Sequence, residues 1–368
     1  MRPIKLPPLS NKDSEEWLTK NQWLLRYAMF RDSHREPASF KLDAQQFQAR
    51  MGKNNSKLAD RYRGALLGLA IGDALGTTLE FSARSSNETH KEIIGQGPFR
   101  LKAGQWTDDT SMALCLAYSL LNTETFDPKD QMDLYVQWWR EGLFSSTGKC
   151  FDIGNTVASA LQRYELNHDP LAGDTDERSA GNGSLMRLAP VVLFFSSQPS
   201  DAIQKAGKSS ETTHRHIETI DACRYFAALL LGALYGEKKE VLLSPGYAPI
   251  SDYWDFHPLC SPMKNIALGS FKQKTRDEIQ STGYVVHSLE AALWSFHNSD
   301  SFESGMIKAV NLAGDADTIG AIYGQLAGAY YGELEMPFRW IKKLTNFHYF
   351  YYLADEMVMF YAGNELSA

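Results

Sequence analysis

The chain has 368 residues, with 37 lysines and arginines against 44 aspartates and glutamates and a sequence pI near 5.8. This acidic balance lacks the basic excess that nucleic-acid binding requires, so we expect no DNA or RNA partner. With 43% hydrophobic and 22% charged residues, the composition is that of a globular protein and excludes a disordered or collagen-like chain.

No segment of the sequence predicts a membrane span or a secretory signal. The longest apolar stretches, around 65–79 and 222–235, are short and are interrupted by Asp73 and Arg224. Prolines and charges occupy the N-terminal MRPIKLPPLSNKDSEE before any apolar region begins. The cysteines show no CxxC spacing, which favours buried thiols over disulfides or a zinc site: Cys115, Cys150, Cys223 and Cys260. We therefore expect a cytoplasmic protein without a membrane partner.

The first 58 residues differ in charge from the rest of the chain. They contain 11 basic and 6 acidic residues, a net charge of +5, whereas 59–368 carries −12. A capping pattern at Ser14 predicts a helix over roughly 15–31. One face of that helix is aromatic and would either pack under a following loop or bind a partner protein: Trp23, Tyr27 and Phe30. We predict an N-terminal extension over 1–58 and one main domain over 59–368.

From residue 59 onward, apolar residues recur at spacings of three and four, which predicts a mainly α fold. Two segments also repeat glycine at every fourth position: Gly64, Gly68, Gly72 and Gly76, and then Gly320, Gly324, Gly328 and Gly332. Each glycine costs a helix interior up to about 1 kcal/mol relative to alanine. Each stripe therefore indicates close contact with another helix.

Three acidic clusters stand at the ends of predicted helices. They are Glu80 in GDALGTTLE, Thr107, Asp108 and Asp109 in WTDDT, and Asp315, Asp317 and Thr318 in GDADT. Helix capping explains one such residue per helix, but not two carboxylates with threonines at both helix starts. If the last two clusters meet, two divalent cations would balance their four carboxylates. Oxygen ligands favour Mg²⁺, Mn²⁺ or Ca²⁺ over zinc, and we expect Mg²⁺ or Mn²⁺; the spacing alone fits a metal site and capping equally well.

Four motifs in order resemble the ADP-ribosylglycohydrolase family: RGALLGLAIGDALGTTLE (63–80), WTDDTSMAL (106–114), GNGSLMRLAP (181–190) and GDADTIGAIYGQLAGA (314–329). The similarity extends over about 59–365. It implies a compact, single-domain, all-α fold with a binuclear Mg²⁺ or Mn²⁺ centre between helix ends. It also implies an enzyme that hydrolyses ADP-ribose from modified protein side chains.

The resemblance assigns ligands for the two metals: Thr107, Asp108, Asp109, Asp315, Asp317 and Thr318. Glu80 matches a glutamate that lies near the ribose and the metals in relatives. The GNGSLMR stretch resembles the loop that wraps the ADP-ribose phosphates, although alone it would predict a plain turn: Gly181, Asn182, Gly183, Ser184 and Met186. In FDIGNT, Asp152 and Asn155 match residues that face the scissile ribose in arginine-type members, whereas DIGN alone is only a helix-start signal.

Three further positions match substrate-side residues of the family: Glu177, His214 and Tyr284. A single histidine such as His214 also fits a structural role. Tyr284 lies in GYVV, which often lines the adenosine end in this family, and it fits the hydrophobic core equally well.

The resemblance also implies a mechanism. Two cations about 3.5–4 Å apart would bind the vicinal ribose hydroxyls and lower the pKa of a water molecule. Asp108 or Asp109 would hold that water while it attacks the anomeric carbon. Asp152 would stabilise the developing positive charge or relay a proton to the departing guanidine. We expect hydrolysis of ADP-ribosylarginine on proteins, with serine or another acceptor as the alternative.

A second interpretation makes the protein a binding or immunity protein. Some bacterial members of the family that the chain resembles serve as immunity proteins against ADP-ribosylating toxins. Residues 1–58 would then bind a cognate ADP-ribosyltransferase, with or without hydrolysis by the main domain. A covering role on the core or self-association would explain the same extension.

Overall fold

The computed structural model describes residues 40–87 and 89–367, so the helix predicted over 15–31 lies outside the described residues. The helices are α3 (Phe40–Gly76), α4 (Asp108–Thr123), α5 (Pro128–Glu141), α6 (Asn155–Asn167), α7 (Ala189–Phe194), α8 (Pro199–Glu211), α9 (Ile217–Tyr235), α10 (Lys239–Leu242), α11 (Tyr253–Phe256), α12 (Ser261–Ala267), α13 (Val285–His297), α14 (Phe302–Val310), α15 (Ala316–Tyr331), α16 (Phe338–Ile341) and α17 (His348–Ser367). Short 3₁₀ turns are η1 (Glu177–Ser179), η2 (Ser270–Gln273), η3 (Arg276–Glu278) and η4 (Glu333–Glu335).

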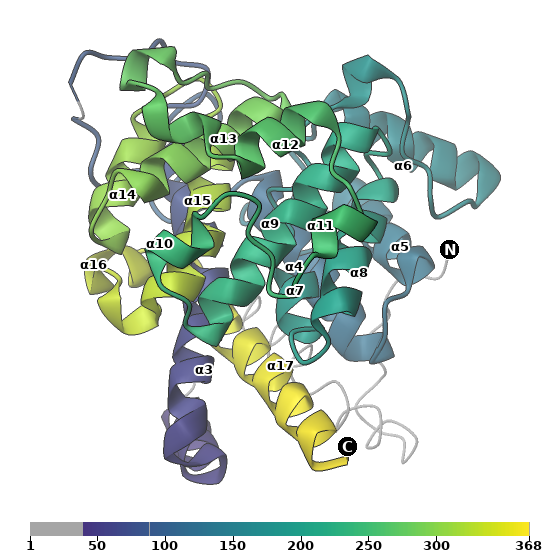
Figure 1. Ribbon diagram of the computed structural model, residues 1–368, viewed down its shortest axis with the longest axis vertical. Helices are drawn as coiled ribbons and strands as arrows, with labels where there is room; N and C mark the ends of the chain where they lie inside the picture. Colours follow the sequence, from purple (N-terminus) through teal and green to yellow (C-terminus); the bar gives the residue numbers. More distant parts are fainter. Residues whose placement is uncertain (1–39, 88, 368) are drawn as a thin grey trace.

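The expected all-α architecture is confirmed (Figure 1). Within the described ranges, extended pairing is limited to four isolated bridges: Glu80 with Gly314, Gln96 with Leu101, Asp174 with His214, and Gly181 with Tyr284. Three of these four bridges join loops at which the sequence places candidate site residues. Extended structure therefore serves here to tie loops together rather than to build a sheet.

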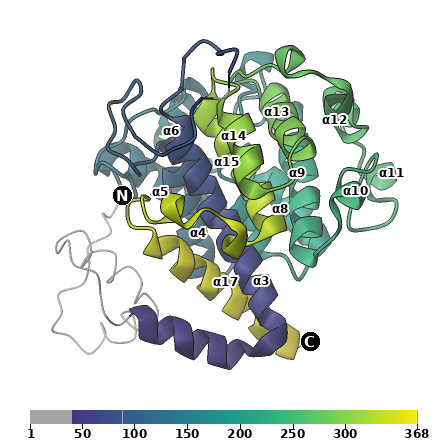
Figure 2. The same cartoon turned by 90° about the vertical axis from the view of Figure 1, so that its left-hand side faces the viewer.

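The centre of the molecule is the pair α3 and α15, which run side by side (Figures 1 and 2). The two glycine stripes face each other in antiparallel register. A Cβ atom added to Gly68 would lie 2.1 Å from the carbonyl oxygen of Gly324, and one added to Gly64 would lie 2.2 Å from that of Gly328. Because any side chain would occupy the partner's backbone, glycine is required for this approach.

The fourth glycine of the second stripe has a different role from the one expected. Gly332 lies just beyond α15 with φ of 86°, where it ends the helix. Ala316 takes its place in the contact, because a Cβ at Gly76 would lie 2.3 Å from the Ala316 carbonyl oxygen. The contact therefore extends from the start of α15 back along the second half of α3.

The other helices enclose this pair. Helices α9, α13 and α14 pack on α15, whereas α4, α7 and α17 pack on α3. Arg63 of α3 donates two hydrogen bonds, of 2.6 and 2.8 Å, to the carboxylate of Asp355 in α17. This largely buried, bidentate pair links the C-terminal helix to the central one.

Two composition-based expectations can be compared with the described residues. All four cysteines are free thiols, and Cys115 and Cys223 are buried. Within the described residues, no helix combines the length with the apolar composition that a bilayer span needs.

The boundary predicted at 58/59 falls inside α3, which begins at Phe40 and continues into the core.

Substitution of Gly324 by alanine is expected to reduce the free energy of unfolding by about 3 kcal/mol, because the new methyl group would lie 1.9 Å from the Gly68 carbonyl oxygen. Denaturant unfolding measures the change. Gly154→Ala is the matched control, since a Cβ there meets nothing within 4 Å and its φ is −62°. Equal stability of both variants would contradict the role given to the glycine contact.

Candidate active site

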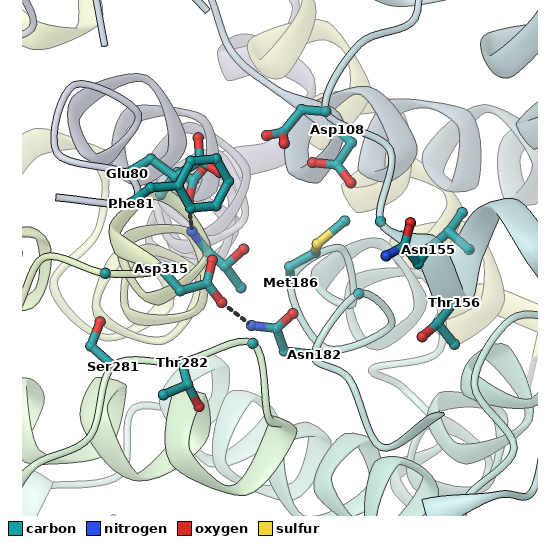
Figure 3. A pocket seen from close by; sticks show the side chains of 18 of the residues that line it. Glu80, Phe81, Asp108, Asn155, Thr156, Asn182, Met186, Ser281, Thr282 and Asp315 are labelled. Atoms are coloured by element: carbon teal, nitrogen blue, oxygen red, sulfur yellow. Dashed lines mark hydrogen bonds between the residues drawn. The ribbon is translucent and has the colours of Figure 1, made fainter. Parts of the chain in front are cut away.

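A cavity of about 490 Å³ opens where the ends of α3, α4, α6 and α15 meet the loop over 181–186 (Figure 3). Eleven of the residues predicted from sequence line it: Glu80, Asp108, Asp152, Asn155, Asn182, Gly183, Met186, His214, Asp315, Asp317 and Thr318. Segments that are far apart in the sequence thus contribute to one site. Thr107 and Asp109 are buried beside it without lining it.

Asp73 organises the start of α4. Its carboxylate, fully buried in α3, accepts hydrogen bonds from the backbone nitrogen and the hydroxyl of Thr107, at 2.9 Å each. It also accepts from the backbone nitrogen of Thr110 at 3.0 Å and from its hydroxyl at 2.6 Å. One carboxylate therefore holds the first turn of α4 and with it Asp108 and Asp109.

The helix-start residues do not serve as ordinary caps. Thr107 and Asp315 occupy the N-cap positions of α4 and α15, yet neither side chain makes a capping hydrogen bond. The hydroxyl of Thr107 donates to Asp73, and Asp315 accepts a 2.6 Å hydrogen bond from the side chain of Asn182. The structure therefore favours a binding site over the capping interpretation of these clusters.

The most compact acidic group combines residues from three segments. Carboxylate oxygens of Glu80, Asp152 and Asp317 lie within 4.8 Å of one another. Of these three, the resemblance assigns only Asp317 as a metal ligand; it places Glu80 near the ribose and the metals, and Asp152 at the scissile ribose. Asp109 joins the group through α15, because the hydroxyl of Thr318 lies 3.5 Å from its Oδ2.

Burial raises the pKa of every carboxyl in the site, and repulsion from neighbouring carboxylates raises it further for five of them: Glu80, Asp108, Asp109, Asp152 and Asp317. Burial, followed by the charge of Asp317, raises the pKa of Glu80 to about 12. Burial, followed by the charges of Asp73 and Asp315, raises the pKa of Asp152 to about 8. The pKa of Asp73 rises only to about 6, because its hydrogen bonds with Thr107 and Thr110 stabilise the charged form.

Four further aspartates follow the same trend, and burial is the largest cause for each raised pKa: Asp108, Asp109, Asp315 and Asp317. No arginine or lysine of the described segments forms an ion pair with any carboxylate of the site. The positive N-terminal ends of α4 and α15 compensate only part of the charge. A bound cation would remove the repulsion.

Two buried oxygen atoms are suited to such a cation. Oε2 of Glu80 and Oδ1 of Asp109 are buried, and neither has a hydrogen-bond partner among the described residues. An unpaired buried carboxylate oxygen is costly unless a ligand or a proton satisfies it. All side-chain atoms offered here are oxygens, which matches the preference of hard divalent cations.

The loop over 181–186 is held against α13 and α15. The backbone nitrogen of Asn182 donates to the carbonyl of Gly283 at 3.0 Å, while its side chain bonds Asp315 and Ser288. The ring of His214 packs under the loop, because a Cβ on Gly183 would lie 2.8 Å from His214 Cε1. A side chain at Gly183 would therefore collide with His214, so glycine is required at this point of the loop.

His214 is part of a buried polar chain. Its Nδ1 lies 2.9 Å from the hydroxyl of Thr213, which accepts a 2.7 Å hydrogen bond from Arg187. Arg187 also donates to the carbonyl of Gly183 at 2.9 Å and stacks over Tyr135. Burial, and secondarily the charge of Arg187, lowers the pKa of His214 to about 3. The imidazole is therefore neutral and supports the glycine loop.

Four other predicted substrate residues lie outside the cavity lining. The hydroxyl of Ser184 is buried and bonds Ser210. Gly181 forms its bridge with Tyr284, whose hydroxyl donates to Glu218 at 2.8 Å. Glu177 is exposed in η1. These four residues therefore do not line the cavity, although Gly181 and Ser184 belong to the same motif as Asn182 and Gly183, which do.

Sequence reasoning did not identify several residues of the site. Asp73 was interpreted only as an interruption of an apolar stretch. Phe81, Val157, Ser281 and Thr282 line the cavity but belong to common residue types in unremarkable positions. For Asp73 a usable signal existed, because a charged residue inside a glycine-striped apolar helix needs a buried partner.

Comparison with known proteins places the chain among enzymes of one type. A family model described as ADP-ribosylglycohydrolase matches residues 54–366. ADP-ribosylarginine hydrolase Tri1 of Pseudomonas putida is 44% identical over 298 residues, which cover 81% of this chain and 78% of that protein. ADP-ribosyl-[dinitrogen reductase] glycohydrolase of Rhodospirillum rubrum is 32% identical over 77% of this chain and 90% of its own length.

The fold matches as well. A solved structure described as an ADP-ribosylglycohydrolase-related protein complex superposes with a TM-score of 0.72. It is 43% identical in sequence, and the match covers 83% of this chain and 99% of that one. Sequence and fold thus give the same relationship independently of the cavity.

His214 should make folding sensitive to acid. Because its pKa is about 3 when folded and 6.5 ordinarily, the unfolded chain takes up a proton first as the pH falls, and stability is lost. The loss due to this group is about 2 kcal/mol between pH 7 and pH 5. Denaturant unfolding of wild type and His214→Gln at both pH values measures it. The variant should lose less stability on acidification, and parallel losses would contradict the assignment.

Proposed function

The chain belongs to the ADP-ribosylglycohydrolase family, as its four motifs predicted, and we propose that it hydrolyses the N-glycosidic bond between ADP-ribose and arginine side chains of modified proteins. The observation that carries this proposal is the convergence of buried carboxylates at one cavity beside a glycine loop. Its similarity to ADP-ribosylarginine hydrolases supports arginine as the acceptor.

Two divalent cations, Mg²⁺ or Mn²⁺, are part of the proposal. Six oxygen-bearing residues at the starts of α4 and α15 would hold them: Thr107, Asp108, Asp109, Asp315, Asp317 and Thr318. Glu80 and Asp152 lie close enough to contribute, given their distances to Asp317. When bound, the cations supply charge neutralisation and Lewis-acid activation of water and ribose hydroxyls.

The cavity has separate regions for the two parts of the substrate. Gly183 lines the cavity and would contact the phosphates of ADP-ribose, and His214 supports the loop at this point. The distal ribose then lies against the acidic cluster of Glu80, Asp152 and Asp317. This arrangement orients the anomeric carbon before reaction.

The reaction needs one water molecule and one proton transfer. Asp108 or Asp109 holds the water. The oxygen of this water forms a bond to the anomeric carbon, and the bond from that carbon to the guanidine nitrogen breaks. The proton lost by the water is relayed through Asp152 to the departing guanidine. Asp152 is placed for this relay, because one of its carboxylate oxygens lies within 4.8 Å of those of Glu80 and Asp317 in the same cluster.

We also infer a partner-binding role for the N-terminal extension. Residues 1–58 carry a net charge of +5 and include Trp17 and Trp23, and the family match begins only at residue 54. A basic, aromatic segment outside the family domain is suited to binding another protein. The proposed partner is a cognate ADP-ribosyltransferase toxin, so that the protein would act both as an inhibitor and as the enzyme that removes the modification.

Hydrolysis is tested by release of ADP-ribose from an arginine-ADP-ribosylated protein in the presence of Mg²⁺ or Mn²⁺. Wild type should release ADP-ribose, and EDTA treatment should stop it. Asp109→Asn should lower kcat at least about 100-fold, because it removes a buried carboxylate from the proposed metal ligands.

Asp255→Asn is the matched control for this experiment, since Asp255 is an exposed acid in α11. Its activity should equal that of wild type. Release only from serine-linked substrate would contradict the choice of arginine, and no release from either substrate would contradict the enzymatic proposal.

The partner-binding role is tested by deleting residues 1–39, which leaves α3 whole from Phe40. The truncated protein should hydrolyse ADP-ribosylarginine like wild type but bind a catalytically inactive cognate ADP-ribosyltransferase at least tenfold more weakly. Calorimetry measures the binding. Unchanged affinity after the deletion would assign the extension another role.

A further inference from the structure

Phe81 is an unusual component of the cavity. Its side chain is 72% exposed, yet it lines the cavity immediately after Glu80. Its backbone has φ of 57°, in the left-handed region that phenylalanine rarely adopts. A large apolar side chain held in solvent by a disfavoured backbone contributes little to the core. A role in binding would account for both features.

The backbone around Phe81 is fixed relative to the acidic cluster. The Phe81 nitrogen donates to the carbonyl of Gly314 at 2.7 Å, and the Gly314 nitrogen donates to the carbonyl of Ser82 at 3.1 Å. Gly314 directly precedes Asp315. The ring is therefore positioned by the same strand-like contact that joins Glu80 to the start of α15.

The ring of Phe81 also has aromatic support on one side. It makes an edge contact with Phe99, with ring centroids 6.4 Å apart. Phe99 in turn lies 5.3 Å from Phe151, which directly precedes Asp152. These contacts join the two segments that carry Glu80 and Asp152, and they leave most of the Phe81 ring exposed.

The position of Phe81 relative to the substrate follows from the cavity. In Figure 3 Phe81 lies on the side of Glu80, across the cavity from Asn155 and Thr156. The glycine loop and His214 provide the region assigned above to the phosphates. Of the described residues that line the cavity, only Phe81 and His214 carry aromatic rings, and His214 is 2% exposed. Phe81 is thus the one accessible aromatic face near the bond that breaks.

We propose that Phe81 stacks on the guanidinium of the modified arginine and selects guanidinium-linked ADP-ribose over substrates with a neutral acceptor. This inference rests on the proposed function. A guanidinium is planar, delocalised and weakly hydrated, so it binds aromatic faces well. Phe81 is therefore a specificity-determining residue that touches the leaving group.

The test replaces Phe81 by 4-fluoro-, 3,5-difluoro- and 3,4,5-trifluorophenylalanine in the full-length protein with Mg²⁺. Fluorine withdraws charge from the ring face and changes its shape little, so folding is preserved. The KM for an arginine-ADP-ribosylated peptide should rise stepwise, by about fivefold in total, with kcat unchanged. We expect KM to change rather than kcat, because the guanidinium is already cationic in the bound substrate, and the ring therefore stabilises the substrate and the transition state to a similar extent.

Three measurements complete the test. The affinity for free ADP-ribose, which lacks the guanidinium, should stay within twofold across the series. The same fluorinated residues at Phe256, an aromatic side chain that is 80% exposed, should leave KM unchanged. Phe81→Leu, which keeps an apolar side chain without a ring, should raise KM about tenfold, and Phe81→Tyr should restore it.

The outcomes separate this inference from the proposed function. A flat KM series with an active wild type would overturn the role of Phe81 alone. A parallel loss of ADP-ribose affinity would overturn it too, since the ring would then contact the ADP-ribose. A wild type inactive on arginine-linked substrate would overturn the proposed function and this inference together.

Discussion

Close contact between α3 and α15 determines the position of nearly every group in the site. The backbone carbonyls of each helix occupy the space in which side chains of the other would lie, and this contact fixes the separation of the two helix axes. Their antiparallel register brings the end of α3 beside the start of α15. Glu80 and Asp317 therefore meet, and Asp73 within α3 reaches the first turn of α4. Cavity, acidic cluster and glycine loop are all assembled around this contact.

The same rigidity explains how the fold tolerates seven carboxylates at one site: Asp73, Glu80, Asp108, Asp109, Asp152, Asp315 and Asp317. A looser frame would relieve their repulsion by letting them separate and become hydrated. Here the surrounding helices pack too closely for the carboxylates to separate. The repulsion between them therefore remains, and it favours the binding of cations or protons. His214 and Asp73, in contrast, have hydrogen-bond partners within the protein itself.

Sequence alone predicted much of this site, since spacing and motif order depend on residue type. The glycine stripes predicted close helix contact, and the acidic motifs predicted residues that do converge. Facing of the two stripes was not predictable, because a stripe carries no information about its partner. Asp73 and Phe81 were missed because their importance comes from neighbours distant in sequence, such as Thr110 and Gly314. Ser184 and Glu177 lie outside the cavity lining, since a motif does not specify which way each loop side chain points.

Because the glycines recur at every fourth residue, the packing of α15 on α3 changes little when one helix is shifted along the other by four residues. Displacement of α15 along α3 by one repeat, about 6 Å, would still leave three of the four pairs of small residues facing each other. The correct alignment must therefore come from features at the two ends of the contact. At one end the nitrogen of Leu334 donates to Asp60, and at the other Glu80 pairs with Gly314. These few polar contacts thus set the register of the two helices, and the geometry of the site depends on that register.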